Sequence, residues 1–87
     1  MNLSKDLERI YIESLLTDTD VAMTLLDLAE MSETIENARQ NYESAEKAYD
    51  HVIAKLPNVN LTAEVEALFE RRLAVLRWRL SANRRFA

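Results

Sequence analysis

The chain of 87 residues contains no glycine and a single proline, Pro57. Glycine supplies the positive φ angles that tight β-hairpin turns need, so a chain without glycine has few ways to build a β-sheet. Alanine, leucine, glutamate and arginine dominate the composition, and all four favour helix. The sequence therefore predicts an all-α protein.

Three helices are predicted within one domain, and local start and stop signals set their boundaries. Thr17, with Asp20 three residues later, has the spacing of a capping box and predicts a helix start. Pro57 disfavours helix at the residue before it, and Thr62 is a suitable N-cap for the next helix. The predicted domain covers residues 1–87, with helices over about residues 4–16, 18–55 and 62–82.

The predicted central helix carries apolar and aromatic side chains at alternating spacings of three and four. They are Leu28, Met31, Ile35, Ala38, Tyr42, Ala45, Tyr49, Val52 and Leu56. Four heptads without a slip are typical of a coiled-coil seam. At ~1.5 Å per residue, this long helix would match the two outer helices placed end to end. Both outer helices would fold back along it, which leaves the monomer two helices thick at every level.

A chain of this size needs help to bury a core. A small domain buries little more than ~60% of its unfolded surface, and there is no cysteine to form a disulfide. In the predicted first helix, Leu7 and Ile10 share one face, and Ile12 and Leu16 lie on the opposite side. The apolar surface of this helix is therefore too wide for one neighbouring helix to cover. We therefore expect a four-helix-bundle-like or coiled-coil-like homodimer. The seam residues expected in its interface are Leu28, Ile35, Tyr42 and Tyr49.

Part of the central helix also fits a repeat pattern. In tetratricopeptide repeats the second helix has tyrosine, alanine, an aromatic residue, alanine and proline at fixed offsets. Those offsets are matched by Tyr42, Ala45, Tyr49, Val52 and Pro57. Residues 38–57 thus resemble the second helix of a tetratricopeptide repeat, with valine in place of the second alanine. The resemblance implies a repeat-like fragment that binds a peptide, but the turn glycine would fall at Gln40 and three or more repeats are normally needed.

The C-terminal helix differs from the rest of the chain in charge. Residues 62–87 hold six arginines and three acidic residues, whereas residues 1–61 have a net charge of −7. Clustered arginines suit nucleic acid, but these point all round the helix of an acidic chain, so nucleic acid is not the expected partner. Arg72 and Arg79, at the edge of the apolar face, are expected to pair with the acidic long helix within or between subunits. Trp78 lies off that face, as a partner-binding anchor or a subunit contact.

No catalytic, cofactor-binding or metal-binding residue is predicted. Zinc sites draw mainly on histidine and cysteine, and the chain has one histidine, His51, and no cysteine. Asp50 is adjacent to His51, but neighbouring residues of a helix do not face each other. No apolar stretch approaches the ~20 residues of a membrane span, and charges interrupt the N-terminal apolar residues, unlike in a signal peptide. We therefore expect a cytoplasmic protein with no membrane partner and no cofactor.

These observations predict a small, non-enzymatic protein–protein interaction module. It would act as a homodimeric adaptor, a chaperone-like protein or a regulatory accessory protein, with a second copy, another protein or a helical peptide as partner. Two alternatives stay open: a nucleic-acid-associated factor that uses the C-terminal arginine-rich helix, and a tetratricopeptide-repeat-like fragment that binds a peptide.

Overall fold

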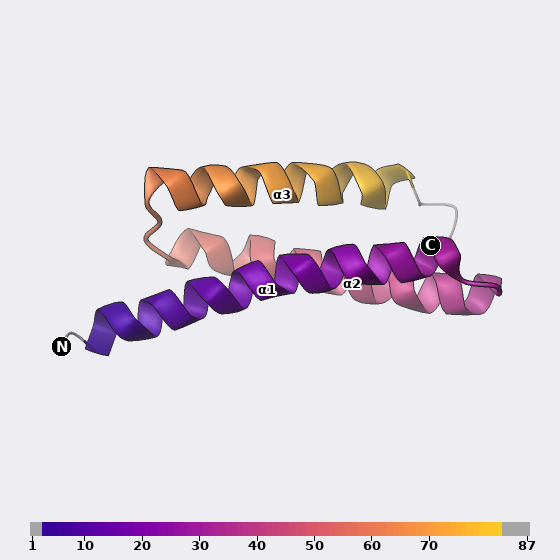
Figure 1. The fold of residues 1–87 in the computed structure, drawn as a ribbon, viewed down its shortest axis with the longest axis horizontal. Coiled ribbons are helices and arrows are strands. Elements are labelled where there is room, and N and C mark those ends of the chain that lie inside the picture. The colour runs from indigo at the N-terminus through magenta and orange to yellow at the C-terminus, as the bar shows by residue number, and fades with distance from the viewer. Residues whose placement is uncertain (1–2, 83–87) are drawn as a thin grey trace.

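The computed structural model describes residues 3–82, and Figure 1 shows the fold. Its elements are α1 (Leu3–Met31), α2 (Ile35–Lys55), the 3-10 turn η1 (Leu56–Asn58) and α3 (Ala63–Ala82). No β-strand occurs among the described residues. The predicted all-α fold class is therefore confirmed.

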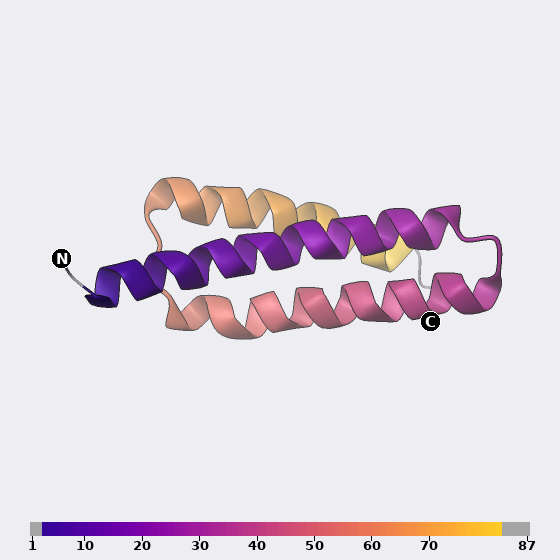
Figure 2. The same cartoon turned by 60° about the horizontal axis from the view of Figure 1, so that its bottom comes forward.

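The three helices form an elongated bundle with extents of 50 × 20 × 18 Å. α1 and α2 make an antiparallel hairpin, and α3 then runs back in the direction of α1 (Figures 1 and 2). α3 contacts both helices of the hairpin. The expected monomer of two helices at every level is therefore wrong, because all three helices lie side by side along most of the rod.

The predicted boundary between the first and second helices, at Thr17, is also wrong. α1 continues without a break through Thr17 and Asp20 to Met31. Thr19 is fully buried, and its hydroxyl donates a 2.6 Å hydrogen bond to the carbonyl oxygen of Leu16. The hydroxyl thus has a hydrogen-bond partner within the helix. Threonine hydroxyls in helices often donate to a carbonyl oxygen one turn earlier. The threonines and aspartates of this stretch therefore do not act as a cap.

The chain instead breaks inside the predicted helix 18–55, at the turn of residues 32–34. Thr34 has the extended backbone of an N-cap, and its Oγ1 accepts a 3.1 Å hydrogen bond from the Asn37 amide. On the other side of the turn, the Ser32 hydroxyl donates to the Leu28 carbonyl oxygen at 2.7 Å. The two side chains satisfy backbone groups at both helix ends, so the turn needs neither glycine nor proline.

This break divides the predicted seam into two parts with different surroundings. Ala38, Tyr42, Ala45 and Val52 of α2 are buried in the monomer. The residues of the seam nearest the turn are exposed instead; they are Leu28, Met31 and Ile35. The same row of apolar residues thus supplies the core of the monomer at one end and an open surface at the other.

The start of α3 agrees with the sequence-based expectation. Pro57 lies in η1, directly after α2. Thr62 precedes α3, and its Oγ1 accepts a 3.3 Å hydrogen bond from the Val65 amide, while its carbonyl oxygen accepts from the Glu66 amide at 2.9 Å. Thr62 is therefore the N-cap of α3, as its position after the proline turn predicts.

One hydrophobic core runs along the bundle, and each helix contributes to it. Its buried members are Leu15, Ala22, Leu26, Ala29, Tyr42, Ala45, Val52, Phe69, Leu73, Leu76 and Leu80. Alanines on both α1 and α2 are buried, and small side chains let two helices approach closely. In the described part of the chain, no helix combines the length and the apolar character that crossing a membrane requires.

Candidate functional site

An uncharged row of side chains runs along the outer face of α1, away from the core. Its members alternate at spacings of three and four residues, and all of them are exposed. We call this row the α1 stripe; it consists of Leu7, Ile10, Ser14, Thr17, Val21, Thr24, Leu28 and Met31. A row with this period stays close to one face of a helix. The α1 stripe is therefore a continuous neutral surface, about 36 Å long at the usual rise per residue.

The large apolar members of the α1 stripe have no cover in the monomer. The exposed fraction is 77% for Met31, 64% for Leu7 and 47% for Leu28, against 0% for Leu26 on the inner face. Ile35, the first residue of α2, continues the row across the turn and is 70% exposed. Extended apolar surfaces of this kind on a small protein mark interaction sites.

From Glu13 to Glu30 the edge of the α1 stripe that faces α3 carries acids, and arginines of α3 bind those between Asp20 and Glu30. Arg72 Nη1 lies 2.9 Å from Asp20 Oδ1. One heptad further on, Arg79 Nη2 lies 2.8 Å from Asp27 Oδ1 and 3.1 Å from Glu30 Oε1. The structure thus places these two arginines, predicted as interface residues, in contacts between α3 and α1 of the same chain.

Arg79 is the more enclosed of the two arginines. Burial by itself lowers its pKa, but hydrogen bonds and charges of Asp27 and Glu30 outweigh burial and hold the pKa above its usual value. The guanidinium of Arg79 therefore stays charged. Glu13 continues the acidic edge seven residues before Asp20, and it lines a hollow together with Val65 near the start of α3.

The opposite edge of the α1 stripe faces α2, which carries two lysines on the bordering side. His51 Nε2 of α2 lies 3.6 Å from Asp18 Oδ2 of α1, which shows that this side of α2 borders α1. Lys47 and Lys55 lie four residues before and after His51, so they occupy the same side of α2. Both lysines are exposed. The neutral surface thus has acids of α1 along one edge and lysines of α2 along the other.

Tyr42 and Tyr49, which the sequence predicts as interface residues, both contact α3 of the same chain. Tyr42 is buried, and its hydroxyl donates a 2.6 Å hydrogen bond to the Leu80 carbonyl oxygen in the last turn of α3. Tyr49 is half-buried, and its hydroxyl accepts a 3.0 Å hydrogen bond from Arg77 Nε. Both contacts join α2 to α3. Trp78, in contrast, is 72% exposed on the outer side of α3.

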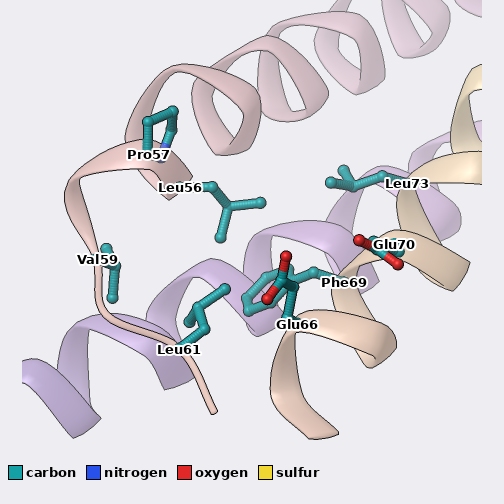
Figure 3. A pocket seen from close by; sticks show the side chains of 8 residues that line it. All are labelled: Leu56, Pro57, Val59, Leu61, Glu66, Phe69, Glu70 and Leu73. Atoms are coloured by element: carbon teal, nitrogen blue, oxygen red, sulfur yellow. The ribbon is translucent and has the colours of Figure 1, made fainter. Parts of the chain in front are cut away.

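A groove of about 320 Å³ opens between η1, the following loop and α3 (Figure 3). Leu56 and Leu73 point into the same space from opposite sides, and Phe69 forms its floor. The carboxylates of Glu66 and Glu70 lie at its rim. The groove thus combines apolar walls with two carboxylates.

Groups that could carry chemistry are dispersed over the described residues. No three histidine, cysteine or acidic side chains come together there as a metal site would require. The contact of His51 with Asp18 lies at the surface, where the His51 side chain is exposed and that of Asp18 is half-buried. The α1 stripe and its edges are therefore the candidate functional site.

Comparisons with known proteins give no match: no family model fits the chain, and neither a curated protein nor a solved structure matches it.

The α1 stripe as a whole was not predicted from the sequence, because the first helix was expected to end at Leu16. The signal was present, since the positions from Leu7 to Met31 alternate by three and four without one charged residue. The same alternation continues past Thr17, and this continuity is the signal that identifies the α1 stripe.

Proposed function

We propose that the protein is a non-enzymatic helical interaction module that works as a homodimer, in the role of an adaptor, a chaperone-like protein or a regulatory accessory protein. The α1 stripe is the observation that carries the proposal. It has the spacing of a helix-pairing seam, it is neutral along its length, and the monomer leaves it open. A seam of this kind is a surface for another helix.

The contacts of the arginines support this proposal over nucleic-acid binding. Arg72 and Arg79 are held by acids of α1, so neither guanidinium is presented to a phosphate. The nucleic-acid alternative depends on three further arginines: Arg77, which donates a 3.0 Å hydrogen bond to the Tyr49 hydroxyl, and Arg84 and Arg85, which lie outside the described residues. We expect the wild-type protein to show no retention on duplex or single-stranded nucleic acid at ~150 mM salt, where phosphate contacts are partly screened.

Light scattering tests the proposal directly. At micromolar concentration the mass should be twice the 10.1 kDa of the chain. Val21→Glu places a charge in the α1 stripe and should convert the dimer to a folded monomer, because a seam does not tolerate an unpaired charge. A monomeric wild type would end the proposal.

The chain offers a matched control for this variant. Val75, on the outer side of α3, is 46% exposed, and Val21 is 45% exposed. Val75→Glu therefore makes the same change in the same helical setting on a different face. We expect Val75→Glu to stay dimeric. Dissociation by Val75→Glu and not by Val21→Glu would move the interface to the side of α3 that carries Trp78.

A further inference from the structure

We infer that the second copy docks on the α1 stripe in parallel, so that the two α1 helices run in the same direction. This inference rests on the proposed homodimer and names its interface and its geometry. The period of the stripe and its small central residues make it a surface for a second α1 helix, and the charges along its two edges select the parallel orientation.

The period of the α1 stripe matches that of two helices wound around each other. Alternating spacings of three and four average 3.5 residues, which is the repeat of a left-handed supercoil. In a parallel pair each stripe position meets its own counterpart. Leu7, Val21 and Leu28 would then each pack against the same residue of the second copy, so apolar residues meet apolar residues at both ends of the contact.

Small residues occupy the middle of the α1 stripe. Ser14, Thr17 and Thr24 lie between the aliphatic ends, and all three are exposed in the monomer. In register, hydroxyls meet hydroxyls and can hydrogen-bond across the seam. Polar residues at seam positions weaken a pair of helices but specify its register, because a shift of one heptad places Ser14 against Val21 and Thr24 against Met31.

The stripe is too narrow to form the whole interface. About 36 Å of helix, with a width of roughly 10 Å, presents a footprint near 360 Å². A standard interface takes about 800 Å² from each partner, so the edges of the stripe must also touch the second copy. The charges on those edges therefore select the orientation.

Two contacts show which charges lie level with each other along the rod. The Asn60 amide donates to Glu8 Oε1 at 2.9 Å, and His51 lies 3.6 Å from Asp18. Glu13, halfway between Glu8 and Asp18, therefore lies level with residues near Lys55. Glu13 is on the edge that faces α3, and Lys55 is on the edge that faces α2.

The two possible orientations differ in what these edges meet. An antiparallel pair puts the α3-side edges of both copies together, so that Glu13 meets an edge whose acids Arg72 and Arg79 already bind. A parallel pair puts the α3-side edge of each copy against the α2-side edge of the other. Glu13 of one copy then faces Lys55 of the other at the same level, twice per dimer. Opposite charges across an interface favour the second arrangement.

Disulfide cross-linking distinguishes the orientations, and the absence of native cysteine makes single-cysteine variants unambiguous. Ser14→Cys and Thr24→Cys are conservative changes ten residues, or about 15 Å, apart on the α1 stripe. A disulfide requires Cα atoms about 4.4–6.8 Å apart, so only positions that face each other cross-link. Ala74→Cys, on the exposed side of α3, is the control.

We expect each stripe variant alone to oxidise to a covalent dimer, and Ala74→Cys to stay a single chain. Cross-linking only in a refolded mixture of Ser14→Cys and Thr24→Cys would show an antiparallel pair and overturn the inference. Cross-linking of Ala74→Cys alone would place the interface on α3 and also overturn it. In both cases a dimer in light scattering would leave the proposed function standing, whereas a monomer would remove both.

A charge exchange tests the edges separately. Glu13→Lys should weaken the dimer about two- to fivefold, as expected for an exposed ion pair at the edge of an interface. Adding Lys55→Glu to the same chain should restore the affinity, because the pair is then reversed in both copies. Failure of the second change to restore the dimer would overturn the assignment of these edges.

Discussion

The inner and outer faces of α1 follow the same spacing but have different surroundings. On the inner face, Leu15, Thr19, Ala22, Leu26 and Ala29 recur at intervals of four and three and are all buried. On the outer face, the α1 stripe recurs at the same intervals and is exposed throughout. Periodicity therefore identifies a surface suited to packing without identifying what it packs against. The inner row meets α2 and α3, and the outer row is exposed in the monomer.

Two leucines of α1 give the largest test of this contrast. Leu26 is 0% exposed on the inner face, and Leu28, two residues later, is 47% exposed on the α1 stripe. Leu26→Ala should lower the free energy of unfolding by about 3 kcal/mol, because it removes buried methyl groups and leaves a cavity. Leu28→Ala should lower it by less than about 1 kcal/mol at concentrations where the monomer predominates. Urea denaturation measures both, and equal losses would contradict the assignment of the two faces.

Two tyrosines sharpen the contrast in α2. Tyr42→Phe removes the donor that the Leu80 carbonyl oxygen uses in the last turn of α3, where helix carbonyls otherwise lack partners. We expect a loss of about 1–2 kcal/mol in the free energy of unfolding. Tyr49→Phe removes a hydrogen bond at the surface, so the loss there should stay below about 0.5 kcal/mol. The reverse order in thermal or urea unfolding would mean that the two tyrosines have been assigned to the wrong surroundings.

The third pair compares arginines on two sides of α3. Arg79→Met keeps the aliphatic stem but removes the charge that binds Asp27 and Glu30, and we expect a cost of about 1 kcal/mol. The figure is modest because water can solvate both acids, which are 63% and 48% exposed. Arg71 is exposed on the outer side of α3, so Arg71→Met should change stability by less than about 0.5 kcal/mol. A larger effect of Arg71→Met in chemical unfolding would argue that α3 packs through its other side.

The smallest expected effect concerns two threonines. Thr34→Ala removes the side chain that caps α2 and should cost about 0.5–1 kcal/mol. Thr17→Ala changes a residue inside α1, where alanine is the better helix former, so stability should stay the same or rise slightly. Circular dichroism during thermal unfolding measures both. A cost for Thr17→Ala and none for Thr34→Ala would favour the chain break predicted from the sequence.

The parts of the fold that local chemistry controls could be predicted from the sequence. The absence of glycine indicated helices, and the turn at Pro57 with the cap at Thr62 placed the start of α3 within one residue. The pairing of Arg72 and Arg79 with acids also occurs, and all three acids lie in α1 of the same chain. The interface residues predicted from the sequence fall into two groups. Leu28, Ile35 and Trp78 are exposed, whereas the two tyrosines and the two arginines contact other helices of the same chain.

The sequence by itself determined that the chain is helical and that several of its faces are suited to packing. Only the tertiary structure decided where the long helical stretch breaks and which face becomes the core. The physical reason is that a helix cap contributes less free energy than the burial of an apolar side chain. Thr17 and Thr34 are both competent caps, and caps are worth about 1 kcal/mol, so local preference separates them poorly. Burying one leucine side chain is worth about 2 kcal/mol or more, so the break falls where α1, α2 and α3 together bury the most apolar surface.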